Sequence, residues 1–260
     1  MPDVPQLDDL NLSLDGFVAT VEIARPPHNF FDFELIANLA TACETLGETD
    51  ECRAIVLCAQ GKSFCAGANF GSGGSEAGRD RRSGHLYQEA VRLFRTPKPI
   101  VAAVQGAAVG GGLGLALAAD FRVACPDSRF VANFTRLGFH PGFGLTETLP
   151  RVIGQQRATL MFYTSRRIKG EEAYDWGLAD VFVPTDEVRA AAQALAAEIA
   201  ENSPLGVVDT RATMRAGLAD RVKAATDREL EIQDKLRATE DFREGVRATA
   251  ERRQPNFKGR

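Results

Sequence analysis

Two glycine-rich segments each follow an apolar run and leave small, accessible backbone behind it. Residues 64–70 read FCAGANF, and residues 106–114 read GAAVGGGLG. Glycine lets another group approach the backbone closely, and the first N–H groups of a helix have no partner within the helix. Two such N–H groups from different loops that face one oxygen form an oxyanion hole. For either segment alone, a tight strand-to-helix turn that needs glycine only for its geometry is the alternative interpretation.

Other common chemistries lack their motifs in this chain. The glycines fit no register of G-x-G-x-x-G, and neither a phosphate-binding G-x-x-x-x-G-K-[ST] loop nor a G-x-S-x-G nucleophile motif occurs. The three histidines, His28, His85 and His140, do not have the spacing of a zinc site. The sequence therefore predicts no metal, no dinucleotide cofactor and no serine hydrolase.

Composition limits the compartment and the partners. The 260 residues are 44% hydrophobic and carry a net charge of −4, which suits one or two globular domains and disfavours nucleic acid as a partner. Charged residues interrupt every apolar run before it reaches the length of a membrane span, and the acidic start MPDVPQLDDL is unlike a signal peptide. Five cysteines without a C-x-x-C pair fit a reducing compartment. We expect a cytoplasmic protein that binds neither nucleic acid nor membrane.

The elements that must position the two glycine segments alternate between strands and helices as far as residue 183. Helical periodicity alone follows, so we expect an α/β body with parallel strands over residues 1–184 and a helical C-terminal subdomain over residues 185–260. The pattern predicts a hairpin at 11–24, strands at 53–59, 101–104, 121–124, 130–132 and 181–183, and helices at 32–46 with Asp32 as N-cap, 81–94, 110–119, 146–152 and 154–164. It predicts loops at 71–80 and 133–145 and further turns marked by Ile168, Glu171 and Trp176-Gly177.

Several of these segments together resemble the crotonase superfamily, also called the enoyl-CoA hydratase/isomerase family. The matching residues are 61–68 (GKSFCAGA), 99–120, 138–144, Trp176-Gly177-Leu178 and the ending from Glu244 to Lys258. The resemblance spans nearly the whole chain. It implies a spiral of strand-strand-helix turns, a C-terminal helical region that packs homotrimers or dimers of trimers, and an acyl-CoA thioester ligand. Coenzyme A is then part of the substrate, and no separate cofactor is implied.

The resemblance also assigns roles within the two glycine segments. It implies that the backbone N–H groups of Ala68 and Gly111 polarise the thioester carbonyl, with Ala66, Gly67 and Gly110 beside them. Polarisation of that carbonyl stabilises an enolate, and loss of one such donor typically costs about 3 kcal/mol of barrier.

The sequence departs from the family at its acid and base positions. The two glutamates that handle water in family hydratases correspond to Gly114 and Phe134. Family isomerases keep an acid at the second of these positions or in the loop at residues 141–144, which has none here. The nucleophilic aspartate of the related 4-chlorobenzoyl-CoA dehalogenase falls at Gly142.

Other side chains are candidates for the missing roles. His140 lies in the same loop and Glu147 starts the next predicted helix, so either could move a proton, although a loop histidine bonded to backbone and a carboxylate that complements a helix dipole are the alternatives. We expect Phe134 and Phe143 to line an apolar acyl pocket. By resemblance, Tyr87 lies on a helix at the pocket border and Lys258 approaches the CoA 3′-phosphate; a packing residue and a solvated basic tail are the alternatives.

These residues favour an acyl-CoA enzyme of the lyase or isomerase class that stabilises an enolate, and they do not favour efficient hydration. Two alternatives remain open from the sequence. One is a non-catalytic protein that binds acyl-CoA or an acyl carrier. The other is a thioesterase or C–C hydrolase, which would use the same oxyanion hole.

Overall fold

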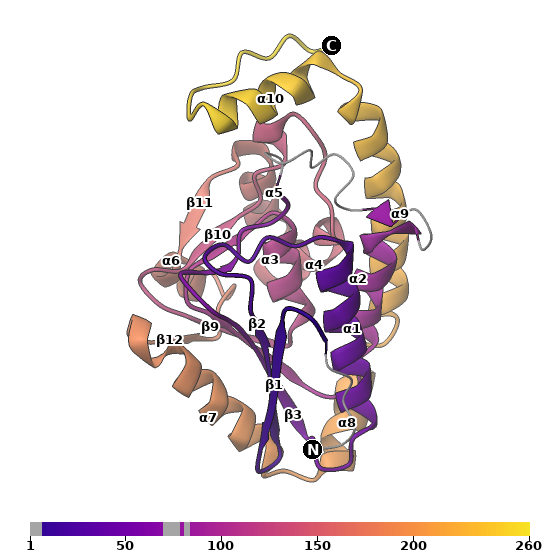
Figure 1. Cartoon of the computed structure of the whole chain (residues 1–260), viewed down its shortest axis with the longest axis vertical. Coiled ribbons are helices and arrows are strands. Elements are labelled where there is room, and N and C mark those ends of the chain that lie inside the picture. The colour runs from indigo at the N-terminus through magenta and orange to yellow at the C-terminus, as the bar shows by residue number, and fades with distance from the viewer. Residues whose placement is uncertain (1–6, 70–78, 81–83) are drawn as a thin grey trace.

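The computed structural model describes residues 7–69, 79–80 and 84–260, and most of its strands form two mostly parallel sheets with helices packed around them (Figure 1). In the main sheet, β1 pairs antiparallel with β2 across the Asp15-Gly16 turn, and the remaining neighbours are parallel. The order is β1 (Leu10–Asp15), β2 (Val18–Ile23), β3 (Ala54–Ala59), β7 (Ile100–Val104), β9 (Phe121–Ala124) and β12 (Val181–Phe182).

A second sheet carries the glycine-rich segments. Its order is β11 (Arg167–Lys169), β10 (Arg129–Val131), β8 (Ala107–Val109) and β4 (Ser63–Cys65), with parallel pairing throughout except between β10 and β11. The pair β5 (Arg79–Asp80) and β6 (Gly84–His85) is separate and antiparallel.

Helices surround these sheets and continue past them to the C-terminus. They are α1 (Phe33–Glu48), α2 (Leu86–Arg95), α3 (Gly111–Ala118), α4 (Leu145–Ile153), α5 (Gln155–Thr164), α6 (Gly170–Asp175), α7 (Val188–Ala200), α8 (Pro204–Met214), α9 (Leu218–Arg237) and α10 (Glu240–Ala250), with 3-10 turns at Thr135–Leu137 and Thr185–Glu187.

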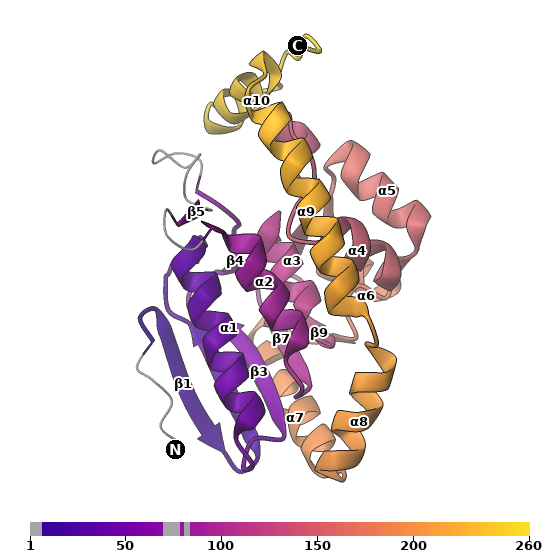
Figure 2. The same ribbon diagram turned by 90° about the vertical axis from the view of Figure 1, so that its right-hand side faces the viewer.

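The central strands β3 and β7 of the main sheet are buried on both faces, which explains why they are continuous apolar runs, whereas the edge strand β1 alternates between buried and more exposed residues. In β3, Ile55 and Leu57 face the large core beneath α1 and α2, whereas Val56 and Cys58 face a smaller core. Small residues of α7 cover that smaller core. The last helices therefore pack on the body: α7 covers the sheet, and α9 runs beside α2 and α4 before leading into α10 (Figure 2).

The structure confirms most of the expected elements. The hairpin, the apolar strands and the glycine-rich helix are present, and Asp32 caps α1 by accepting a hydrogen bond from the N–H of Leu35 at 3.0 Å. Two expectations are wrong in detail. Ile168 and Glu171, expected to mark turns, lie in β11 and α6, and the helix expected from residue 81 begins at Leu86, where the Nδ1 atom of His85 caps it by accepting from the N–H of Tyr87.

Two expected elements lie partly in residues that the structure does not describe. Most of the loop expected at 71–80 and the beginning of the helix expected at 81 lie outside the described residues. None of the helices in the described ranges is long and apolar enough to cross a bilayer. Within the same ranges, no group of His, Cys, Asp or Glu is arranged to hold a metal ion.

One carboxylate joins the end of the glycine-rich helix to α8. Asp120 accepts a hydrogen bond from the backbone N–H of Ile100 at 2.8 Å, and its two oxygens also pair with Arg211 at 2.9 Å and Arg215 at 2.8 Å. All three charged side chains are at most 14% exposed. A buried charge that loses its partner is costly, so this pairing fixes how α8 docks.

Asp120→Ala should therefore destabilise the protein by about 3–5 kcal/mol, because two buried guanidinium groups lose their carboxylate. Asp227→Ala is the matched control, since Asp227 pairs with Lys223 on the surface, and its removal should cost less than about 1 kcal/mol. Urea unfolding measures both values; equal losses would contradict the structural role of Asp120.

Candidate active site

The two glycine-rich segments meet because they follow neighbouring parallel strands. Ser63 pairs with Ala107 and Cys65 with Ala108, so β4 and β8 end at the same edge of the second sheet. The chain leaves β4 into residues 66–69 and leaves β8 into the start of α3. Backbone from both strand ends thus lies side by side.

Glycine is required where these backbones touch. Gly67 has a φ of +85°, and a side chain there would lie 2.7 Å from the carbonyl oxygen of Val109. A side chain at Gly112 would lie 2.1 Å from the carbonyl oxygen of Cys65. No side chain fits at either distance, so the two glycines set how closely the loop and the helix approach.

Two backbone N–H groups at this junction have no acceptor among the residues that the structure describes. The N–H groups of Ala66 and Gly110 each donate to a backbone carbonyl, at 2.9 and 2.8 Å. In the part of the chain that the structure describes, those of Ala68 and Gly111 donate to nothing, and both residues line the same cavity. Gly111 is also the first residue of α3, where the helix dipole adds partial positive charge. The pair can therefore stabilise an anionic oxygen.

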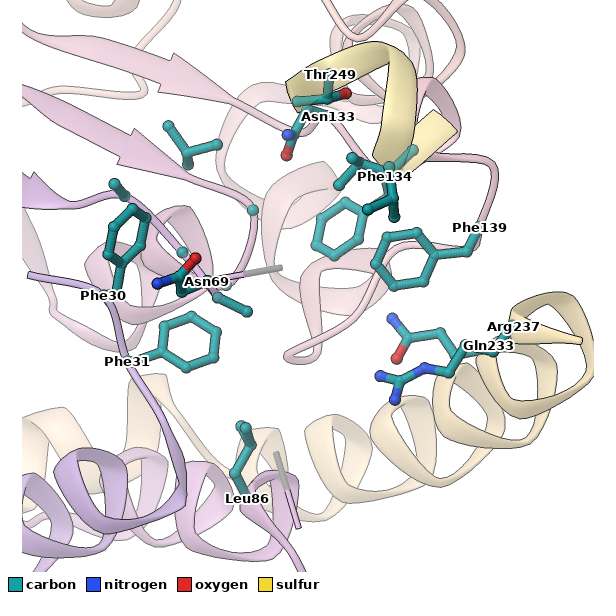
Figure 3. Close-up of a pocket in the computed structure, with 18 of the residues that line it drawn as sticks. Phe30, Phe31, Asn69, Leu86, Asn133, Phe134, Phe139, Gln233, Arg237 and Thr249 are labelled. Atoms are coloured by element: carbon teal, nitrogen blue, oxygen red, sulfur yellow. The ribbon is translucent and has the colours of Figure 1, made fainter. Parts of the chain in front are cut away.

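The cavity above these donors has a volume of about 350 Å³ and is mainly apolar. Phe30 and Phe31 border it on one side and Phe134 and Phe139 on another, while Gln233 and Arg237 project from α9 (Figure 3). Among the described residues, neither aspartate nor glutamate lines it. Its lining is completed by residues 66–69, 85–87, 109–111, Asn133, Leu137, Val246, Thr249 and Ala250.

Polar groups of α9 form one wall of the site, and the sequence analysis missed them. Glu229, Gln233 and Arg237 are four residues apart, which places them on one face of the helix. Gln233 is fully buried: its Oε1 accepts from the Tyr87 hydroxyl at 3.0 Å, and its Nε2 donates to the carbonyl oxygen of His140 at 2.8 Å. Polar residues at every fourth position of an amphipathic helix were the available signal.

Tyr87 lies in the cavity wall, as the resemblance implies. Burial raises the pKa of its hydroxyl above the ordinary tyrosine value, and the nearby Glu229 carboxylate adds to this shift. The hydroxyl therefore stays protonated at neutral pH and acts as a hydrogen-bond donor.

The two candidate proton carriers lie elsewhere. The Nδ1 atom of His140 is 2.8 Å from the carbonyl oxygen of Pro141, and because a carbonyl only accepts, the proton is on Nδ1. Glu147 accepts from Arg221 Nε at 2.8 Å near the surface. Neither residue belongs to the cavity lining. Their placement matches the alternatives given above, a loop histidine bonded to backbone and a carboxylate at the start of a helix.

Lys258 also lies away from the cavity. Its Nζ donates to Asn256 at 3.2 Å, and its backbone N–H donates to Asp241 at 2.6 Å. The residue borders a separate charged hollow near the C-terminus, so a phosphate role for it stays a prediction.

A buried carboxylate holds the loop that passes beneath the donors. Glu229 is 1% exposed and accepts from the N–H of Gly144 at 2.8 Å and from Thr146 N and Oγ1 at 3.0 and 2.6 Å. Burial raises the pKa of Glu229, while the hydrogen bonds from Thr146 and Gly144 oppose that shift. These bonds satisfy N–H groups at the start of α4. They also fix the backbone next to Phe143, the residue before Gly144.

Phe143 packs under the donors instead of lining the acyl cavity as expected. Its φ is +63°, its side chain is 1% exposed, and its ring centroid is 5.9 Å from that of Phe31. A Cβ atom at Gly114 would lie 2.6 Å from Phe143 Cδ1. Phe143 therefore fills the space that any side chain at position 114 would need.

Gly142 is closed to a side chain in the same way. A Cβ atom there would lie 1.9 Å from the Tyr87 hydroxyl oxygen and 2.5 Å from Gln233 Nε2. The loop therefore has no room for a carboxylate at this position while the contact between Tyr87 and Gln233 is present.

Comparison with known proteins agrees with this geometry. The profile of the family described as Enoyl-CoA hydratase/isomerase matches residues 14–260. The chain belongs to the enoyl-CoA hydratase/isomerase family. Relatives include the 1,2-epoxyphenylacetyl-CoA isomerase of Escherichia coli, 31% identical over 94% of this chain and 95% of the relative. The crotonyl-CoA hydratase of Syntrophomonas wolfei is 30% identical over 96% and 98%.

Solved structures of the family share the fold. An enoyl-CoA hydratase/isomerase from Pseudoalteromonas atlantica superposes with a TM-score of 0.86 at 29% identity, covering 96% of this chain and 100% of the other. The α/β body and the C-terminal helices described above are thus those of the crotonase fold.

Gly114→Ala should destabilise this family member by about 1–3 kcal/mol, because the added methyl overlaps the Phe143 ring in a packed core. In a Phe143→Gly background the same change should cost much less, since both the ring and the Cβ atom of Phe143, which lies 2.8 Å from the added methyl, are gone and alanine favours helix over glycine by about 1 kcal/mol. Chemical denaturation of the two single variants and the double variant measures the coupling. Additive effects would show that Phe143 does not occupy this space.

Because four cysteine thiols are buried, we expect the protein to lose stability at alkaline pH. Burial raises the pKa of Cys43 and Cys65 to about 12 and that of Cys52 and Cys58 to about 11, above the value of 9.0 for a free thiol. These thiols are protonated near neutral pH, which excludes Cys65, beside the donor loop, as a ready nucleophile. Between pH 9 and 11 the unfolded chain releases protons that the native protein retains, so stability falls.

The free energy of unfolding should drop by up to about 1.4 kcal/mol per pH unit for each buried thiol above pH 9. Urea unfolding from pH 8 to 11 measures the slope. Cys65→Ala should reduce that slope by the share of one thiol, and an unchanged slope in this variant would show that Cys65 is not shielded.

Proposed function

We propose that the cavity binds an acyl-CoA thioester and that the N–H groups of Ala68 and Gly111 donate to its carbonyl oxygen. The observation that supports this most directly is the pair of N–H groups without acceptors at the ends of adjacent parallel strands. Loss of a proton or a group at the α-carbon would produce an enolate, whose charge these donors would stabilise. The names of the relatives, an epoxide-acyl-CoA isomerase and a crotonyl-CoA hydratase, fit this ligand class.

Within the family, we propose lyase or isomerase chemistry and little hydration. Phe143 fills the space beside Gly114, a phenyl ring stands at position 134, and Tyr87 and Gln233 occupy the space beside Gly142. His140 and Glu147 do not line the cavity, so His140→Ala and Glu147→Gln should leave acyl-CoA affinity unchanged.

One observation favours a second function, that of a non-catalytic acyl-CoA binder. Of the residues described around the cavity, none is a carboxylate, although family hydratases and isomerases depend on one. An assembly of three or six chains and a cytoplasmic location stay predictions from the resemblance and the composition.

Crotonyl-CoA hydration, followed as loss of the enoyl-thioester absorbance, should be slow or absent, because none of the described lining residues is a carboxylate that could activate water. A panel of acyl-CoA thioesters, assayed in parallel for binding by calorimetry and for turnover by chromatography, separates the two functions. Binding with turnover supports the enzyme, and binding without turnover of any member supports the binder. Rapid crotonyl-CoA hydration would contradict the interpretation of positions 114, 134 and 142.

Ala68→Pro tests the oxyanion hole directly, because proline removes the backbone N–H that the proposal uses. Turnover of any substrate found in the panel should fall by roughly 10²–10³-fold, the usual effect of losing one oxyanion donor. Free coenzyme A is the control ligand: it has no thioester carbonyl, so its affinity should not change. Equal losses of affinity for coenzyme A and its thioester would point to a folding defect, and unchanged turnover would refute the role of Ala68.

A further inference from the structure

The apolar cavity has a neighbour on the far side of two aromatic side chains. A second cavity of about 240 Å³ lies between α2 and α9. In the described part of the chain, the residues that line both cavities are His85 and Tyr87. These two side chains therefore form the wall between the cavities.

This wall is tightly held. Tyr87 and His85 are 9% and 7% exposed, and their rings pack edge to face with centroids 4.3 Å apart. The Tyr87 hydroxyl donates to Gln233 Oε1 at 3.0 Å, which joins the start of α2 to α9 at this level. Position 87 thus blocks the passage between the two helices with a ring that is anchored at its far end.

The second cavity is lined by buried or half-buried residues inside and by charged residues at its rim. Its inner wall is formed by buried Val91, half-buried Leu230 and buried Thr226. Its rim carries the exposed charged side chains of Arg95, Lys223 and Asp227. Apolar atoms would be covered inside, while the charged rim would stay in water.

We propose that Tyr87 is the residue that limits acyl-chain length in this protein. With the ring in place, the acyl cavity ends at Tyr87, and acyl groups are confined to the space between the donors of Ala68 and Gly111 and this wall. Without the ring, the two cavities would join and a longer alkyl chain could continue between α2 and α9. This inference rests on the proposed binding of acyl-CoA thioesters.

Calorimetry with a series of saturated acyl-CoA thioesters from C4 to C16 tests the proposal with wild type, Tyr87→Ala and Tyr87→Phe. For wild type, affinity should stop increasing at a limiting chain length. In Tyr87→Ala that limit should move to longer chains, with binding tightened about fourfold for each additional methylene that enters the second cavity. Tyr87→Phe keeps the ring and loses only the hydroxyl contact, so its limit should match wild type.

A second variant, which removes less of the side chain, keeps the test valid if Tyr87→Ala does not fold. Tyr87→Leu retains apolar packing but lacks the reach of the ring, and it should shift the limit in the same direction as Tyr87→Ala. Thermal unfolding shows which variants are folded and can be compared. Binding by wild type with the same limit in folded Tyr87→Leu or Tyr87→Ala would overturn the role of Tyr87. Failure of wild type to bind any thioester would instead overturn the proposed function.

Discussion

The parallel pairing of β4 with β8 is the constraint on which the site depends. It brings two strand ends to one edge, and the absence of side chains at Gly67 and Gly112 lets the following backbones touch. The candidate donors are main-chain groups whose positions are set by sheet register and by the start of α3. Side-chain rotamers do not enter this geometry.

Around these strand ends, apolar side chains line the cavity, and polar side chains of α9 hold the neighbouring loop and helix in place. Phe31, Phe134 and Phe139 give the cavity apolar walls, and a low local dielectric strengthens a hydrogen bond to a bound carbonyl. The α9 face supplies the polar counterpart. Its Glu229 fixes the loop before α4, and its Gln233 ties α2 to that loop through Tyr87 and His140. A helix of the predicted C-terminal subdomain thus shapes a site whose donors lie in the body.

Local patterns predicted the elements whose causes are local. The Asp15-Gly16 turn, the Asp32 cap and the apolar strands follow from residues that are close in sequence, and the glycine-rich segments predicted places where another group can approach the backbone closely. The three-residue strands β4, β8 and β11 are too short to show a period and went unrecognised. The contact between Tyr87 and Gln233 joins residues 146 positions apart, so no sequence window contains it. The inward turn of Phe143 likewise depends on Glu229, which lies far along the chain.

The packing of Phe143 against Gly114 constrains the order in which this site could change during evolution. A carboxylate at position 114 would meet the phenyl ring before it could reach a ligand. The ring would have to shrink or swing away first, and that step leaves a buried void with nothing gained in chemistry. Each substitution is therefore unfavourable until the other is present. Substitution of either residue alone is disfavoured, so a change to a glutamate-dependent site would need both positions to change together.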